Sequence, residues 1–110
     1  MILITGPLYS GKENWIRNRL CLTEEAFAAC AVRDVQELVP CPDPEALVAE
    51  LKKKRIVICT ETGCGVIPID RDQREKREAA GRLSCRLAEE ADTVVRVCCG
   101  LPQLLKGEWP

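Results

Sequence analysis

The stretch LITGPLYSGKE, residues 3–13, decides the expected fold class of this 110-residue chain. The apolar residues 1–5 are typical of a buried strand, and a glycine follows them at once. The spacing Gly6-x4-Gly11-Lys12 is that of a loop that wraps phosphate groups at the start of a helix. Unpaired amide groups and the helix dipole favour an anion there. The stretch therefore predicts a strand, a phosphate-binding loop and a helix, with the lysine reaching the terminal phosphates.

The residue after Lys12 departs from this motif. A serine or threonine normally stands there and binds Mg²⁺ through its hydroxyl, whereas this chain has Glu13. Three interpretations stay open: the carboxylate binds Mg²⁺ directly, binds it through water, or only favours the first helical turn as an acid. The residues predicted to contact a bound nucleotide are Gly6, Pro7, Leu8, Tyr9, Ser10, Gly11, Lys12 and Glu13.

A second acid is expected to end a neighbouring strand, where it can hold a metal ion or orient a nucleophile. RIVICTE, residues 55–61, is a continuous apolar run rich in β-branched side chains. Such a run is typical of a strand buried on both faces of a parallel sheet. Glu61 closes the run and is the candidate catalytic and metal-binding acid. The alternative is a carboxylate at a loop edge without function.

Helices are expected to alternate with strands in the first half of the chain. Periodic apolar side chains predict a helix over residues 11–21. Thr23 can cap a short helix over residues 23–30, and DVQELV, residues 34–39, is then expected as a strand. An Asp-Pro pair opens a helix over residues 43–54, which ends in lysines.

The second half continues the alternation. TGCGVIP, residues 62–68, is expected as a loop because glycines punctuate it. A long helix is predicted over residues 70–92, and its one interior glycine, Gly81, suggests close packing. Residues 93–99 are expected as a strand, and residues 100–110 close the chain. The inner face of the long helix is predicted to carry Ala80, Leu83, Leu87 and Ala91. Together these elements predict a single α/β domain with a small parallel sheet flanked by helices.

Composition excludes several classes of protein. Lys and Arg number 16 and Asp and Glu 17, so a net charge of −1 gives no reason to expect nucleic acid or an acidic membrane as partner. No apolar run is long enough to span a bilayer, and the start of the chain does not read as a signal peptide. We therefore expect a cytoplasmic protein.

The cysteines admit two interpretations. Eight cysteines occur without any C-x-x-C spacing and without any histidine, which favours reduced structural thiols. The alternative is a thiol or metal protein, for which the ligand spacing is poor.

Further motifs follow the loop in the order seen in one known family. ETGCGVIP, residues 61–68, matches E-V-G-x-G-I-V-P, and ADTVVRVCCGLP, residues 91–102, matches A-D-x-V-x-x-V-x-x-G-L-P. REAAGRLSCRLA, residues 77–88, matches R-D-x-A-G-R-x-N-Q-R-L-A except for Glu78, Ser84 and Cys85. The chain thus resembles the bifunctional adenosylcobinamide kinase/adenosylcobinamide-phosphate guanylyltransferase family of cobalamin biosynthesis.

This resemblance implies a small P-loop NTPase-like sheet protein that phosphorylates a corrinoid, cobinamide, with GTP or ATP and Mg²⁺, in a trimer. It implies catalytic roles for Lys12 and Glu61, and it suggests that Arg77 and Arg82 reach the ligand. These 110 residues lack the family's guanylylated histidine and its aspartate-bearing strand D-C-L-T-L-W. Guanylyl transfer is therefore not expected. The alternative is a non-catalytic relative that acts as a binding or regulatory partner.

Overall fold

A computed structural model describes residues 1–62 and 70–110 of the chain. The predicted loop over residues 62–68 lies, after Thr62, outside the described residues. The elements in chain order are β1 (Ile2–Gly6), α1 (Lys12–Arg19), α2 (Glu24–Cys30), β2 (Ala31–Val32), the 3₁₀ helix η1 (Val35–Leu38), α3 (Pro44–Leu51), β3 (Ile56–Thr60), α4 (Arg71–Glu90), β4 (Thr93–Cys98) and β5 (Leu101–Lys106).

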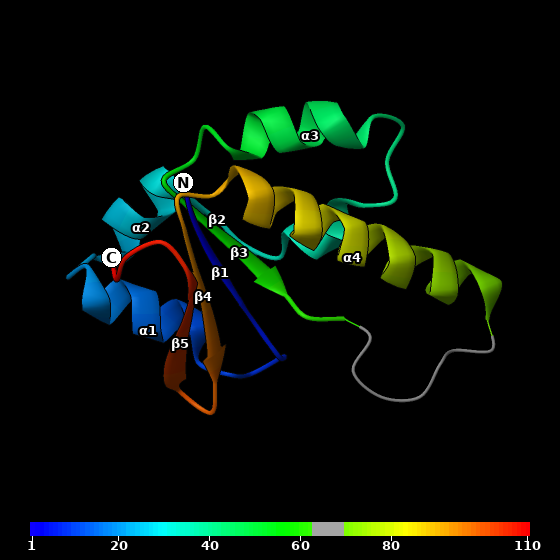
Figure 1. The fold of residues 1–110 in the computed structure, drawn as a ribbon. Helices are drawn as coiled ribbons and strands as arrows, with labels where there is room; N and C mark the ends of the chain where they lie inside the picture. Colours follow the sequence, from blue (N-terminus) through cyan, green and yellow to red (C-terminus); the bar gives the residue numbers. More distant parts are fainter. Residues whose placement is uncertain (63–69) are drawn as a thin grey trace.

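The five strands form one sheet in the order β2-β3-β1-β4-β5 (Figure 1). Strand β1 lies at its centre and pairs in parallel with both β3 and β4, and β2 pairs in parallel with β3. Of the strands in the described residues, only β5 runs antiparallel, against β4. The predicted α/β class with a mainly parallel sheet is therefore confirmed.

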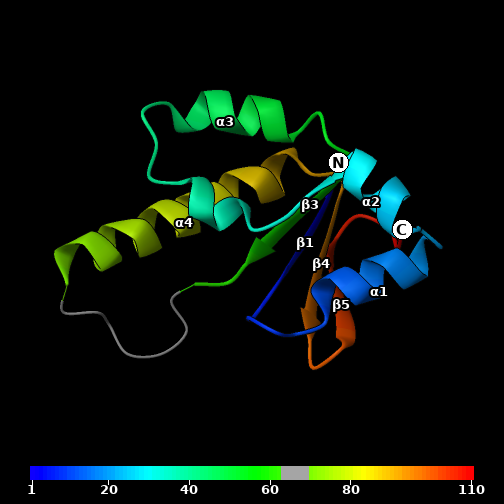
Figure 2. The same ribbon diagram turned by 180° about the vertical axis from the view of Figure 1, so that it is seen from behind.

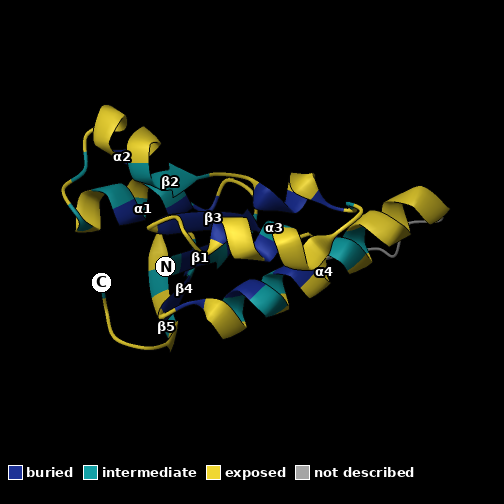
Figure 3. Ribbon diagram, turned by 90° about the horizontal axis from the view of Figure 1, so that it is seen from above, coloured by how far each residue is buried: buried dark blue, intermediate teal, exposed yellow. Residues whose placement is uncertain are grey.

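Helices cover both faces of the sheet, as Figures 1 and 2 show from opposite sides. Side chains alternate along each strand, so Leu3 packs with α3 and α4 on one face, whereas Ile4 packs with α1 and α2 on the other. Strand β3 is buried along its whole length. Seen from above in Figure 3, buried residues lie where the helices meet the sheet and exposed residues lie on the outer helix faces. The apolar runs of the sequence thus form the core between two helical layers.

The predicted helix starts are confirmed by their caps. The side chain of Thr23 accepts a hydrogen bond of 3.1 Å from the amide of Ala26, and Asp43 accepts one of 3.1 Å from Ala46. Each cap satisfies an amide that the first helical turn leaves unpaired. The four residues predicted for the inner face of the long helix are all buried: Ala80, Leu83, Leu87 and Ala91.

The strand predicted over residues 34–39 is wrong. Strand β2 ends earlier, at Val32, and the chain then forms η1, with Asp34 in the left-handed region at φ 52°. The turn of η1 lets the side chain of Gln36 accept a hydrogen bond of 2.9 Å from the amide of Thr60. The side chain of Gln36 thus binds the backbone at the end of β3. A longer β2 would have bound this part of β3 through its own backbone.

Two other features differ from expectation. A Cβ built on Gly81 meets no atom within 4 Å, so the suggestion that this glycine marks close packing is wrong. Residues 101–106, to which the sequence assigned no element, form β5 after a turn in which Cys99 and Gly100 both have positive φ. Such a two-residue turn suits the twist of an antiparallel hairpin.

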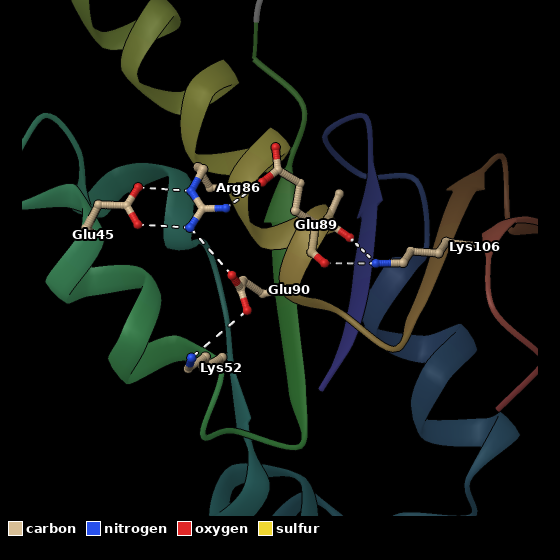
Figure 4. Close-up of polar contacts among 7 residues, drawn as sticks. Glu45, Lys52, Arg86, Glu89, Glu90 and Lys106 are labelled. Carbon is tan, nitrogen blue, oxygen red and sulfur yellow. Dashed lines mark hydrogen bonds and ion pairs between the residues drawn. The ribbon is translucent and has the colours of Figure 1, made fainter.

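Charged side chains tie the end of α4 to its neighbours (Figure 4). Both nitrogens Nε and Nη2 of Arg86 donate to the carboxylate of Glu45 on α3, each at 2.9 Å. These hydrogen bonds raise the pKa of Arg86 and lower that of Glu45. On the other side, Lys106 of β5 donates to the carbonyls of Ala88 and Glu89, each at 2.9 Å. Arg86 therefore links two helices, α3 and α4.

Candidate active site

The loop between β1 and α1 requires both of its glycines. Gly6 has φ +152°, and a Cβ on it would lie 2.1 Å from the carbonyl oxygen of Val97. Gly11 is the N-cap of α1 at φ 84°. A side chain at the first position would collide with β4, and the second position lies in the region that favours glycine. The two motif glycines thus allow the chain to turn from the central strand into a helix.

Lys12 folds back into this loop. Its ammonium donates a hydrogen bond of 2.6 Å to the carbonyl of Pro7 and lies 3.5 Å from the hydroxyl of Ser10. The residue is only 7% exposed, and burial lowers the pKa of its amine, opposed mainly by the negative charges of Asp34 and Glu61. The structure therefore places a buried cation at the amino end of α1.

The hairpin turn that follows β4 contacts the loop between β1 and α1. The amide of Gly100 donates to the carbonyl of Ser10 at 2.8 Å, and a Cβ on Gly11 would lie 3.5 Å from the Cα of Gly100. The loop therefore contacts β4 at Gly6 and is hydrogen-bonded to this turn at Ser10.

A hollow of about 270 Å³ opens over the loop at the carboxyl end of the sheet. Ligands of open parallel sheets bind at this end, outside the strand termini. Tyr9 is 94% exposed and Leu8 is 63% exposed, so both of these lining residues are open to solvent. The described residues that line this hollow, called here the loop hollow, are Leu8, Tyr9, Ser10, Gly11, Lys12, Glu13, Asn14, Arg33, Asp34, Ile58 and Thr60.

Glu13 lines the loop hollow but its carboxylate is engaged. Nε of Arg33 donates to Oε1 of Glu13, and the guanidinium of Arg33 lies 5.1 Å from the centre of the Phe27 ring. Glu13 also stands in the first turn of α1, where an acid is favourable. Its role as a metal ligand stays a prediction.

Glu61 directly follows β3, at the carboxyl end of the parallel strands, where the loop hollow also lies. Its amide donates to the carbonyl of Gly6 at 2.8 Å, and its carboxylate binds Arg96 through two hydrogen bonds of 2.6 and 3.0 Å. The described residues that line the loop hollow do not include it. The sequence placed this acid correctly at the strand end, and its catalytic and metal-binding roles stay predictions.

An acid that sequence reasoning missed lies inside the loop hollow. Asp34 follows β2 after one residue. Its Oδ1 accepts from the hydroxyl of Thr60 and from the side-chain Nε2 of Gln36, each at 3.4 Å. The apolar dipeptide before Arg33 and Asp34 was the available signal, a short strand that ends in charged residues. The sequence pattern predicts the strand over residues 34–39, which would place Asp34 inside the strand and not after it.

The oxygen atoms of Asp34 and Thr60 are of the kind that Mg²⁺ prefers. Mg²⁺ keeps several waters and binds one or two protein oxygens together with phosphate oxygens. Asp34 and Thr60 supply a carboxylate and a hydroxyl side by side, in the same hollow as Lys12. Within residues 1–62 and 70–110, no group of three or more His, Cys, Asp or Glu side chains could hold a metal by itself. The donor set therefore suits a cation that arrives with a phosphate chain.

A larger groove of about 830 Å³ lies between α3 and α4 and shares no residue with the loop hollow. Its walls are mainly apolar, with Val48, Leu83 and Pro40 among them. Size alone would favour this groove, and Pro44 and Glu45 bring the amino end of α3 into it. That end is already capped by Asp43, however, and none of the described residues that line the groove is a buried lysine or arginine. The chemistry for an anion is at the smaller hollow.

Comparison with known proteins identifies the family. The sequence model of a protein family, described as cobinamide kinase / cobinamide phosphate guanyltransferase, matches residues 14–105 of this chain. The chain belongs to this family. This match begins directly after Glu13, so it does not include the phosphate-loop motif. The resemblance inferred from the motifs is confirmed.

One curated family relative shows how much of the family this chain covers. The bifunctional adenosylcobalamin biosynthesis protein CobP of Pseudomonas aeruginosa is 33% identical over 89 residues. The matched region covers 72% of this chain and 51% of that protein. The chain therefore spans about half the length of this relative.

Arg77 and Arg82, the two motif arginines that the resemblance suggested as ligand contacts, do not line the loop hollow. Arg82 forms an ion pair with Glu78 on the outer face of α4, at 3.6 Å, and it lines the groove between α3 and α4. Arg77 lines a separate hollow of about 140 Å³ beside Gln36 and Lys76. A ligand contact by Arg77 or Arg82 stays a prediction.

Two structural findings bear on the other expectations from the sequence. In the part of the chain that the structure describes, no helix combines the length and the hydropathy that crossing a bilayer requires. The seven described cysteines are free thiols, of which Cys59 is buried. The cytoplasmic location stays a prediction.

Proposed function

We propose that residues 1–110 act as one nucleotide-binding domain that holds a purine nucleoside triphosphate in the loop hollow and transfers its terminal phosphoryl group to a corrinoid. The observation that carries this proposal is Lys12, a buried ammonium at the amino end of α1. A phosphate chain in the hollow would replace the carbonyl of Pro7 as its partner. Membership of the cobinamide kinase family supports the choice of acceptor.

The residues of the loop hollow suggest a division of roles. Backbone amides at the start of α1 would bind phosphate oxygens, and Lys12 would stabilise charge that develops on the leaving diphosphate. Asp34 and Thr60 would hold Mg²⁺, which supplies neutralisation of the phosphate charge when bound. Glu61, fixed by Arg96, would support the loop through its bond to Gly6.

The binding step can be tested by calorimetric titration with ATP and GTP, with and without Mg²⁺. We expect Lys12→Ala to weaken binding at least tenfold, because a charge-assisted bond to phosphate is lost. Lys54→Ala is the matched control. Lys54 is an exposed lysine just before β3, at the amino end of the parallel strands and thus opposite the loop hollow. Equal affinity in the wild type and Lys12→Ala would contradict the proposal.

The transfer step needs its own experiment. Purified protein is incubated with cobinamide, Mg²⁺ and ATP or GTP labelled at the γ-phosphate, and labelled cobinamide phosphate is separated and counted. We expect product in the wild type and in Lys54→Ala, and none above background in Lys12→Ala. The size of the assembly, for which a trimer is the proposal, is measured on the same sample by analytical ultracentrifugation.

One observation favours a second candidate function, a non-catalytic binding or regulatory partner. Glu13 and Glu61, the two acids predicted as metal ligands, are both paired with arginines. Such pairing would leave nucleotide binding intact and remove metal-dependent transfer. Binding that depends on Lys12, without labelled product at any Mg²⁺ concentration, would support this alternative.

A further inference from the structure

Among the described residues that line the loop hollow, Arg33 is the one charged residue to which the expected chemistry gives no role. It follows β2 directly and lies at the carboxyl end of the sheet, in the same hollow as Lys12 and Asp34. The motif of the loop requires a lysine but no arginine at this place. Its position depends on the pairing of β2 with β3 and not on the local sequence around the loop.

Two contacts hold the guanidinium at the mouth of the hollow. Phe27 of α2 lies beneath it, at 5.1 Å from the ring centre, and Glu13 of α1 binds its Nε. The side chain of Arg33 is 53% exposed and that of Glu13 is 34% exposed, so the pair faces solvent where a ligand would enter. A cation stacked on a ring keeps its direction without being buried.

The chemistry of guanidinium suits a phosphate chain. Five N–H donors in a planar fork match phosphate oxygens, and the charge persists at every physiological pH. A loop with one ammonium and a helix amino end neutralises only part of a triphosphate. A carboxylate at position 13 beside that ligand would add repulsion unless a cation accompanied it. Arg33 can supply this charge from within the same chain.

We propose that Arg33 is a second phosphate-binding cation of the loop hollow, and that Glu13 restrains it at the mouth until a polyphosphate takes its place as partner. This inference rests on the proposed nucleotide site. It goes further by assigning a contact from the β2 end of the sheet, and by giving Glu13 the role of a competitor for Arg33. The preferred ligand is a tri- or diphosphate chain and not a monophosphate.

The test is a double-mutant cycle read by calorimetry with ATP, ADP, AMP and inorganic tripolyphosphate. The variants are Arg33→Gln, Glu13→Gln and the pair together, with Arg33→Lys as the conservative variant. Arg55→Gln removes the same charge at the amino end of β3, opposite the hollow, and serves as control. Thermal unfolding of each variant shows that the fold is retained.

We expect Arg33→Gln to weaken ATP and tripolyphosphate binding about tenfold, to change AMP binding little, and to act at least as strongly when Glu13 is already Gln. Arg33→Lys should recover part of the loss, and Arg55→Gln should match the wild type. A loss that appears only while Glu13 is present would mean that Arg33 merely neutralises that carboxylate, and it would overturn the inference.

The remaining outcomes separate the inference from the proposed function. If Lys12→Ala weakens binding and Arg33→Gln does not, the nucleotide site stands and the role of Arg33 is refuted. If the wild type binds neither ATP nor tripolyphosphate, the nucleotide proposal fails, and the role of Arg33 fails with it.

Discussion

Arg96 on β4 donates two hydrogen bonds, of 2.6 and 3.0 Å, to the carboxylate of Glu61, which directly follows β3. Strand β1 lies between these two strands in the sheet, so the ion pair crosses the end of β1 where Gly6 begins the loop. The amide of Glu61 binds the carbonyl of Gly6 in the same place. The ion pair and this backbone bond thus add to the ladder hydrogen bonds that already join β1 to β3 and β4.

Removal of this pair should destabilise the protein measurably. The side chains of Arg96 and Glu61 are 36% and 22% exposed, so Arg96→Gln leaves a carboxylate partly shielded from water. We expect a loss of about 1 kcal/mol in the free energy of unfolding, measured by urea denaturation. Arg82→Gln, which breaks the exposed pair with Glu78, should cost less than about 0.5 kcal/mol. Equal losses in both variants would contradict the structural role of Arg96.

We expect the affinity for ATP to fall with rising pH, and to do so at a pH below the ordinary pKa of a lysine side chain. Burial lowers the pKa of Lys12, and only its protonated form attracts phosphate. Calorimetry between pH 7 and 10.5 should show affinity lost as pH rises through this lowered pKa. Lys12→Ala should bind weakly and show no such transition, and it controls for thiols and phenols that titrate in the same range.

The same shift has a consequence for stability with a defined sign. Between the lowered pKa of Lys12 in the folded protein and the ordinary lysine value, the unfolded chain binds more protons than the folded chain does. The contribution of Lys12 to the free energy of unfolding therefore rises with pH in that window. The difference between wild type and Lys12→Ala in urea denaturation isolates this contribution.

Two glycine substitutions should have opposite effects on stability. A Cβ on Gly81 meets open space inside an exposed part of α4, so Gly81→Ala should stabilise the protein by about 1 kcal/mol through helix propensity and unfolded-state entropy. A Cβ on Gly6 would lie 2.1 Å from the carbonyl of Val97, so Gly6→Ala should destabilise it. Urea denaturation of both variants checks the signs, and a destabilised Gly81→Ala would contradict the open surroundings of that residue.

The cysteines should differ in their rates of alkylation. Burial raises the pKa of the Cys59 thiol, and its sulfur lies 3.2 Å from the hydroxyl of Ser84. The thiolate is the reactive form, so iodoacetamide at pH 8 should label exposed Cys85 and Cys99 well before Cys59, as mapped by peptide mass spectrometry. In urea the three should react at similar rates. Labelling of folded protein at Cys59 as fast as at Cys85 would show that the core around β3 is open.

Part of this molecule was readable from local pattern. The apolar run of β3, the caps Thr23 and Asp43, and the buried face of α4 follow from spacing along the chain, because helices and strands repeat over a few residues. The glycines of the β1–α1 loop were readable for the same reason, since the conformation of a turn depends on the residues within it.

The sequence by itself determined the α/β class, the loop and the position of Lys12 at a helix start. Only the tertiary structure decided which polar side chains meet there: Arg33 with Glu13, Arg96 with Glu61, and Asp34 with Thr60. Each of these pairs joins residues 20 or more positions apart. Their contact depends on which strands lie side by side and where each strand ends, and local periodicity contains neither.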